Sequence, residues 1–155
     1  LQNLIKSDYM DNLIVTGVLV LNPEGKVLLV KKPDGVGPYP GTFLTPGGGV
    51  ETDESIDAAA IRELYEETGV KVSNLTRIYF DDDFTGNWKG VEKHFIMLLY
   101  TAQYVSGDLK PTSGDDDNLE IISWYSPDEV EKLKLSPPIS KLLKLIRVKH
   151  NRFLF

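Results

Sequence analysis

Three glutamates, Glu63, Glu66 and Glu67, stand three and four residues apart in a segment with helical periodicity. Each helical residue advances by about 100°, so the three carboxylates share one face. Like charges at this spacing cost roughly 0.2–0.5 kcal/mol per pair, and the helix dipole at a C-terminus adds roughly 0.3–1 kcal/mol. Arg62 is the only basic residue between Gly41 and Val70. The cluster needs an explanation that its own helix does not supply.

Two interpretations of the cluster are open. It is either a solvated acidic face, which is common in proteins, or a site where a divalent cation neutralises the carboxylates. Oxygen ligands of this kind suit Mg²⁺ or Mn²⁺. We favour the metal site, because a local rule that is broken without local compensation indicates function.

Gly47, Gly48 and Gly49 precede this helix. They form either a plain turn or a backbone segment that comes close to a metal or a phosphate, since glycine adopts conformations closed to other residues. No Gly-Lys-Ser or Gly-Lys-Thr follows, so the run is not a P-loop.

The composition limits the partners. The chain has 155 residues, a formal net charge of −6, two histidines and no cysteine. An acidic protein is a poor nonspecific nucleic-acid binder, which needs clustered Lys and Arg, but a metal can still bridge it to a small phosphorylated ligand. Disulfide and thiolate chemistry are excluded, and His94 and His150 are too few and too far apart for a histidine-based metal site. Any metal is therefore expected to be a hard cation.

The longest apolar run, Leu13–Leu21, is far shorter than the roughly 20 residues that a membrane helix needs, and no basic segment precedes it. We therefore expect no membrane partner and a cytoplasmic location.

The hydrophobic pattern predicts the elements that must position these groups. We expect strands at 12–21, 26–32, 72–81, 91–105 and 119–125. Helices are predicted from Asp53 or Glu54 to Thr68, at 126–133 and at 138–149, with Asp53 as the N-cap and Gly69 as the stop of the first. Loops are expected at 33–46 and, rich in acidic and aromatic residues, at 81–90.

This order of elements predicts an α/β (α+β) protein in which helices cover both faces of a mixed sheet. The length fits one domain, which we place at residues 11–155. Residues 1–10 are expected to be an N-terminal extension.

Within the segment 47–70, a fixed set of residues matches every constrained position of the Nudix box: Gly48, Glu54, Arg62-Glu63-Leu64, Glu66-Glu67 and Gly69-Val70. The chain therefore resembles the Nudix (MutT-like) hydrolases. The resemblance implies a Nudix-type α/β/α sandwich with a mixed β-sheet. It also implies hydrolysis of a pyrophosphate linkage in a nucleoside diphosphate derivative, with one or more divalent cations.

The resemblance also implies roles by position. Glu66 and Glu67 are expected to be metal ligands, Mg²⁺ or Mn²⁺ being the metal, and the backbone carbonyl of Gly47 is expected to be another. Glu63 is either a further ligand or the general base that takes a proton from the attacking water. Gly48 is expected to contact the substrate.

Arg62 and Glu54 are expected to support catalysis as an ion pair that orients the carboxylates. The alternative for Arg62 is a simple salt bridge to Glu66.

Relatives often add an acidic ligand or base from a later loop. We expect Glu120 in this role, with Asp117 close behind and Asp116 also available. The aspartates at 81–83 are a further alternative, but we expect them to lie in a solvated loop.

Residues outside the box must recognise the substrate. Lys31 and Lys32 end the second predicted strand, where triphosphate-handling relatives carry a basic residue for the phosphates, and we assign this role to Lys32. The alternative is an edge-strand lysine pair. Phe80 and Trp88, with Phe84 between them, are expected to provide a stacking surface for a base, although such residues are more often packing residues.

The segments 39–51, 80–84 and 134–145 are most similar to the bacterial nucleoside triphosphatases that prefer pyrimidine deoxynucleotides. We therefore predict a (deoxy)nucleoside triphosphate as substrate, with the monophosphate and pyrophosphate as products. Two alternatives are open. One is hydrolysis of ADP-ribose or another nucleotide sugar or dinucleotide, and the other is a non-catalytic nucleotide-sensing domain. The expected partner is a small nucleotide, and the expected assembly is a monomer or a homodimer.

Overall fold

The computed structural model describes residues 11–35, 37–111 and 119–150, and only the backbone of 147–150. Within these ranges the elements are, in chain order, β1 (Asn12–Leu21), β2 (Val27–Lys31), β3 (Phe43–Leu44), α1 (Ile56–Thr68), β4 (Lys71–Trp88), β5 (Val91–Ser106), β6 (Ile121–Tyr125), α2 (Pro127–Val130) and α3 (Pro137–His150). Among the described residues, no helix is both long enough and apolar enough to cross a membrane.

The strands form one mixed sheet in the order β3-β2-β1-β5-β4, and β6 pairs with β2. β1 runs parallel to β5 along its whole length, from Asn12 opposite His94 to Leu21 opposite Gln103. The other strand pairs are antiparallel. The predicted mixed sheet is confirmed.

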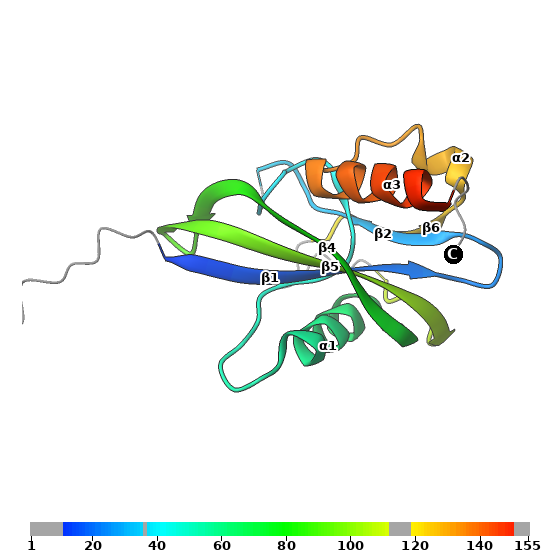
Figure 1. Cartoon of the computed structure of the whole chain (residues 1–155), viewed down its shortest axis with the longest axis horizontal. Coiled ribbons are helices and arrows are strands. Elements are labelled where there is room, and N and C mark those ends of the chain that lie inside the picture. Colours follow the sequence, from blue (N-terminus) through cyan, green and yellow to red (C-terminus); the bar gives the residue numbers. More distant parts are fainter. Residues whose placement is uncertain (1–10, 36, 112–118, 151–155) are drawn as a thin grey trace, which may run out of the picture.

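Helices cover both faces of this sheet (Figure 1). On one face Leu64 of α1 packs with Val18 and Val20 of β1. On the other face Leu142 of α3 packs with Leu19 of β1. Because successive strand residues point to opposite faces, the apolar run in β1 supplies both layers of the core. The α/β/α sandwich is confirmed.

β1 and β2 pair only next to their connecting turn, at Leu21 and Val27. Beyond this point the loop before α1 lies along β1. Three backbone hydrogen bonds hold it there: Val18 N to Pro46 O (2.9 Å), Thr16 N to Gly48 O (2.8 Å) and Val50 N to Ile14 O (3.0 Å). The glycine run is therefore attached to the central strand of the sheet.

The loop expected at 81–90 is mostly strand. β4 continues to Trp88, which pairs with Val91 of β5, and the reversal is confined to Lys89 and Gly90, both with positive φ. The prediction was wrong because pairing with β5 and the packing of two aromatic side chains outweigh the loop-like composition of this segment. Phe84 and Trp88 both pack their rings against Phe95.

The expectation of a solvated location for the aspartates at 81–83 is also wrong for Asp81, which is only 3% exposed. Its carboxylate accepts a hydrogen bond from Lys141 Nζ of α3 at 2.7 Å, and Lys141 also pairs with Asp83. A lysine from a distant helix therefore compensates the burial of this charge.

α1 begins at Ile56, two or three residues later than expected. Ser55, not Asp53, is its N-cap, and the Ser55 hydroxyl accepts a hydrogen bond from Ala58 N at 3.1 Å. Asp53 has a φ of 69° and lies in the turn before the helix, so it does not have the extended backbone of a cap. The predicted stop is confirmed, since Gly69 has a φ of 79° and donates its N–H to Tyr65 O.

Candidate active site

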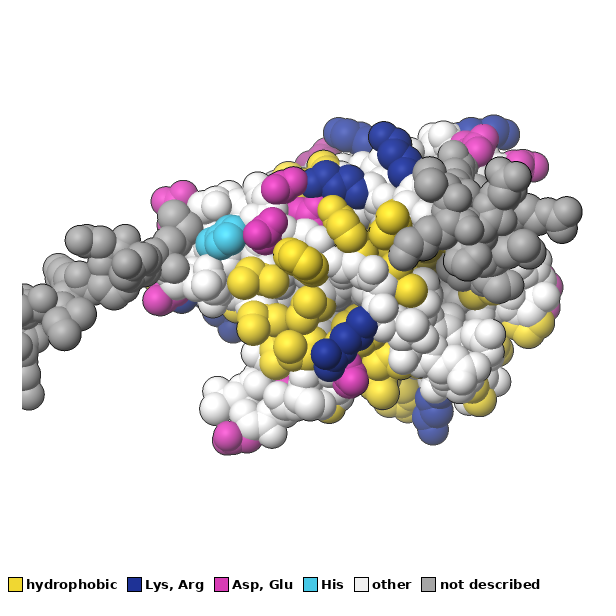
Figure 2. Space-filling model, in the orientation of Figure 1, with side chains coloured by type: hydrophobic (Ala, Val, Ile, Leu, Met, Phe, Trp, Pro, Cys, Tyr) yellow, Lys and Arg dark blue, Asp and Glu magenta, His cyan; other side chains and the backbone are white. Residues whose placement is uncertain are grey.

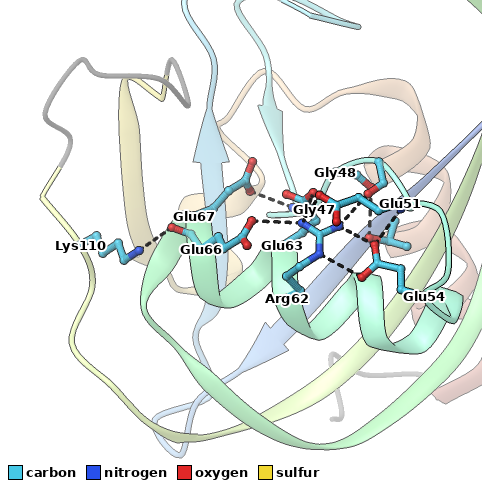
Figure 3. Close-up of polar contacts among 11 residues, drawn as sticks. Gly47, Gly48, Glu51, Glu54, Arg62, Glu63, Glu66, Glu67 and Lys110 are labelled. Atoms are coloured by element: carbon cyan, nitrogen blue, oxygen red, sulfur yellow. Dashed lines mark hydrogen bonds and ion pairs between the residues drawn. The ribbon is translucent and has the colours of Figure 1, made fainter.

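Glu67 lies where the last turn of α1 faces the glycine run. Its side chain is buried, with 8% exposed, and its Oε2 accepts a hydrogen bond from Gly47 N at 2.8 Å. The bond joins two segments that β1 and α1 hold together, and Figure 3 shows the carboxylate pointing toward the loop. A charged carboxylate is thus fixed beside the backbone of the predicted metal site.

Arg62 connects most of the acidic residues around it. Its Nε and one terminal nitrogen bind both oxygens of Glu54, at 3.0 and 2.6 Å. The other terminal nitrogen binds Glu63 at 2.8 Å and Glu66 at 3.1 Å. The guanidinium also donates to Gly49 O at 3.0 Å (Figure 3). Arg62 therefore fixes the carboxylates of α1 relative to the glycine run, as a forked, permanently charged donor can.

The ion pair shifts both partners' pKa values. The hydrogen bonds from Arg62, followed by the one from Glu51 N, lower the pKa of Glu54 to about 2. The same bond to Glu54 raises the pKa of Arg62, and Glu63 adds to this effect. Glu54 is therefore fully ionised at neutral pH, and the pair predicted from the sequence is present.

Close contacts leave no room for a side chain at the first two glycines of the run. A Cβ on Gly47 would lie 1.9 Å from the backbone oxygen of Thr16, and a Cβ on Gly48 would lie 2.5 Å from Glu63 Oε2. A Cβ on Gly49 would meet nothing within 4 Å. The run is therefore more than a plain turn, because Gly47 lets the loop approach β1 and Gly48 leaves room for the Glu63 carboxylate.

Lys110 compensates the C-terminus of α1, and the sequence did not indicate this role. Its Nζ donates to the backbone oxygen of Glu66 at 2.7 Å and lies over the Tyr65 ring. Its backbone N–H donates to Thr68 O at 3.0 Å. The positive charge that the last turn lacks thus comes from the segment after β5, and only the fold brings it there.

Two depressions meet at the glycine run. A mostly apolar cavity of about 80 Å³ lies between the start of α3 and the sheet, with Val15, Met97 and Ile139 in its wall. A larger, acidic groove of about 740 Å³ has Glu51, Glu63 and Glu67 in its wall. The residues that line both are Lys32, Gly47, Gly48, Glu67 and Trp88. Figure 2 shows apolar side chains gathered on one face of the molecule, with basic and acidic side chains around them.

The predicted substrate residues divide into two groups. Lys32, Gly48 and Trp88 lie at the junction of the cavity and the groove. Phe80 lies in neither wall and is 58% exposed on β4. Its neighbour Phe84 packs between Tyr39 and Phe95. Three of the four predicted substrate residues are therefore close to the carboxylates.

Of the acidic residues expected from the later loop, Glu120 lies within the described residues and is not at the groove. Glu120 is exposed, pairs with Lys31 Nζ at 3.2 Å and is absent from both walls. Asp116 and Asp117 lie outside the described residues. The role of Glu120 as a metal ligand stays a prediction.

The donor set at the groove fits a hard divalent cation. The carboxylates of Glu63 and Glu67 in the groove wall, the carboxylate of Glu66 on the same helix but outside the wall, and the carbonyl of Gly47 would supply oxygen ligands, the type that Mg²⁺ and Mn²⁺ prefer. In the described parts of the chain, no three Asp, Glu, His or Cys side chains are gathered around one point. Arg62 instead holds Glu63 and Glu66. Cation binding by Glu66 would therefore require its side chain to turn from Arg62 toward Glu67.

The comparisons with known proteins agree with this geometry. Residues 11–146 match the family model described as the NUDIX domain. The NAD-capped RNA hydrolase NudC of Pseudomonas aeruginosa (strain LESB58) is 34% identical over 127 residues, which are 81% of this chain and 41% of NudC. The nucleoside triphosphatase NudI of Escherichia coli O81 (strain ED1a) is 27% identical over 132 residues, which are 81% of this chain and 91% of NudI.

A solved structure shows the same fold. The MutT NUDIX hydrolase from Burkholderia pseudomallei superposes with a TM-score of 0.71 at 24% identity, over 86% of this chain and 97% of that one. The present chain spans only about two-fifths of the length of NudC, so the match concerns part of NudC. On the family match and the intact box, the chain belongs to the Nudix family of hydrolases.

Proposed function

We propose that this chain hydrolyses a nucleoside triphosphate to the monophosphate and pyrophosphate. The observation that carries the proposal is the wall shared by the apolar cavity and the acidic groove. An apolar cavity with few polar groups suits a base, and a groove lined by carboxylates and Lys32 suits a metal-bound polyphosphate. One nucleotide can occupy both, with its base beside Trp88 and its sugar near Gly48.

The residues at the junction, together with Glu66 beside it on α1, have distinct roles in this proposal. Glu66, Glu67 and the Gly47 carbonyl hold Mg²⁺ or Mn²⁺, the kind of cofactor that Nudix hydrolases generally use. When bound, the cation offsets the phosphate charge and lowers the pKa of water. Lys32 binds a phosphate, and Trp88 stacks on the base.

Glu63 accepts the proton of the attacking water. Its carboxylate lies against Gly48, inside the groove wall, while Arg62 holds one of its oxygens. The water oxygen forms a bond to the α-phosphorus, the bond from that phosphorus to the bridging oxygen breaks, and pyrophosphate leaves. Arg62 and Glu54 act as positioning residues, because they contact carboxylates rather than the reacting atoms.

The identity of the nucleobase is the more specific part of the proposal. The similarity of 39–51, 80–84 and 134–145 to pyrimidine-preferring triphosphatases supports a pyrimidine deoxynucleotide. NudI, a nucleoside triphosphatase by name, matches this chain over 91% of its own length, which supports a triphosphate.

The names of some relatives favour a second activity. NudC is named for an NAD-capped substrate, which contains a dinucleotide pyrophosphate. Hydrolysis of ADP-ribose or another nucleotide sugar or dinucleotide would use the same carboxylates. A nucleotide-sensing domain without catalysis is less well supported, since a pure binder has no use for Glu63 as a base.

A substrate panel tests the proposal. The protein is incubated with Mg²⁺ and the canonical deoxynucleoside triphosphates, dUTP, ADP-ribose or NADH, and the products are identified by ³¹P NMR. We expect monophosphate and pyrophosphate from the triphosphates. Cleavage of ADP-ribose or NADH without triphosphate turnover would contradict the proposed triphosphatase activity and support the second activity. Nucleotide binding without any turnover would contradict both and support the sensing domain.

A further inference from the structure

Lys89 stands at the tip of the β4–β5 hairpin, in a backbone conformation that suits a lysine poorly. Trp88 of β4 pairs with Val91 of β5, so the turn consists of Lys89 and Gly90 alone. Their φ angles are 50° and 84°, as in a type I′ turn, for which Asn-Gly is the preferred sequence. The left-handed conformation is strained for a residue with a Cβ, and strain of this kind is concentrated at functional sites. The position is therefore worth examining for a function of its side chain.

The hairpin tip forms part of the wall of the acidic groove. β4 and β5 join at the end of the sheet where β1 begins (Figure 1). Asn87, Trp88 and Lys89 line the groove, together with the carboxylates of Glu63 and Glu67. Lys89 Nζ lies 5.8 Å from the centre of the Trp88 ring, which is itself in the wall. The ammonium group is therefore at the groove.

The lining residues give the order in which the parts of a nucleotide meet the two lysines of the site. Lys32 and Trp88 line both the cavity and the groove, whereas Lys89 lines only the groove. With the base in the cavity, Lys32 lies at the junction, near the sugar and the first phosphates. Lys89 lies farther from the base, so the phosphate that reaches it is the terminal one of a triphosphate.

The ammonium of Lys89 is available to bind a phosphate. Among the described residues, no carboxylate forms an ion pair with Lys89, whereas Lys93, on the β5 side of the same hairpin, pairs with Asp11 at 2.9 Å. Lys89 is exposed, so its contact with the Trp88 ring is weak. A charge-assisted hydrogen bond to a phosphate oxygen is stronger and can replace that contact.

We propose that Lys89 Nζ binds the terminal phosphate of a nucleoside triphosphate, and that this contact makes the chain discriminate triphosphates from diphosphates. The inference rests on the proposed function. Lys89 binds the part of the substrate that leaves as pyrophosphate and does not contact the α-phosphorus. Its contact is equally present before and during the reaction, so its loss raises KM more than it lowers kcat.

The α,β-methylene analogues of dUTP and dUDP are suitable probes, because they bind without turnover. Their binding in the presence of Mg²⁺ is measured by calorimetry, and KM and kcat for dUTP are measured in parallel. We expect wild type to bind the triphosphate analogue more tightly. Lys89→Asn should reduce that preference about tenfold, the effect of one charge-assisted hydrogen bond, and should raise KM for dUTP.

Two further variants serve as controls. Lys89→Arg retains the positive charge and should retain the preference for the triphosphate analogue. Lys93→Met removes the same charge from the same hairpin, but Lys93 lies in neither wall, so this variant should also keep the wild-type preference.

Thermal unfolding of Lys89→Asn distinguishes this role from a structural one. Asparagine suits the turn better than lysine, so we expect a Tm at least as high as that of wild type, although the preference falls. An unchanged preference in Lys89→Asn, or equal binding of the two analogues by wild type, would overturn the inference. Because analogue binding needs no turnover, the expected loss of preference in a protein that hydrolyses no dUTP would overturn only the proposed function.

Discussion

At the scale of single residues, the lack of a side chain at Gly48 determines where the predicted general base, Glu63, can lie. The missing Cβ of Gly48 is the space that the Glu63 carboxylate occupies. We expect Gly48→Ala to displace that carboxylate and to lower kcat by roughly 100-fold, since a misplacement of about 1 Å can cost this much. Stability should change little, because the end of the flexible Glu63 side chain can move.

Gly49→Ala is the matched control, since its Cβ would meet nothing within 4 Å and its φ is not positive. Steady-state kinetics and thermal unfolding of both variants check the prediction. Equal activities of the two variants would show that the position of Glu63 has no bearing on the rate.

Glu54 provides a pH prediction. Its pKa in the folded protein is about 2, below the ordinary value of 4.5, mainly because of Arg62. A lowered pKa gives stability that is complete above the unfolded pKa and is lost as pH falls through the folded one. We expect Glu54→Gln to be less stable than wild type at pH 7, with the difference shrinking between about pH 4.5 and 2.

Urea unfolding at a series of pH values measures this difference, with Glu24→Gln in the exposed β1–β2 turn as the control. A Glu54→Gln deficit that stays constant from pH 7 to pH 2.5 would show that the carboxylate charge is not what Arg62 stabilises.

At the scale of elements, the C-terminus of α1 depends on a residue from another segment. Lys110 Nζ donates a hydrogen bond to the backbone oxygen of Glu66. Because Lys110 is exposed, we expect Lys110→Met to cost only about 0.5–1 kcal/mol, or about 2–4 °C in Tm. The loss should be larger at low salt, where the charges are less screened.

Thermal unfolding of the metal-free protein is measured at about 20 mM and about 500 mM NaCl. The comparison separates the electrostatic effect, which salt screens, from an effect of lost packing. Lys134→Met, which removes an exposed lysine between α2 and α3, is the control. A salt-independent decrease in Lys110→Met would attribute the effect to the Tyr65 contact rather than to the helix dipole.

β4 shows why local patterns mislead at this scale. Three consecutive aspartates and a glycine are typical of a loop, yet Asp81 is buried against Lys141 and the strand continues to Trp88. Pairing with β5 outweighs local propensity, because each strand residue gains a hydrogen-bonded neighbour. Neither Lys141 nor Lys110 could have been assigned from the sequence, since both partners come from segments far along the chain.

At the scale of the whole molecule, the box could be predicted because its chemistry is local. Glu63, Glu66 and Glu67 lie on one helix, so their spacing alone places them together. The cavity could not be predicted from the sequence, because β1, β5 and α3 each supply part of its wall. For the same reason, the sequence did not show that Phe80 lies away from the cavity, although it belongs to the same segment as Trp88.

The central claim is that the carboxylates of α1 drive metal-dependent hydrolysis, and Glu67→Gln tests it most directly. Gln retains an oxygen that can accept the Gly47 N–H, so the fold should be preserved. We expect kcat/KM for the best substrate to fall at least about 100-fold, the loss of roughly 3 kcal/mol of transition-state stabilisation, with Tm within about 2 °C of wild type. Glu92→Gln, an exposed change in β5, should remain fully active. A folded Glu67→Gln protein with wild-type kcat/KM would contradict the account.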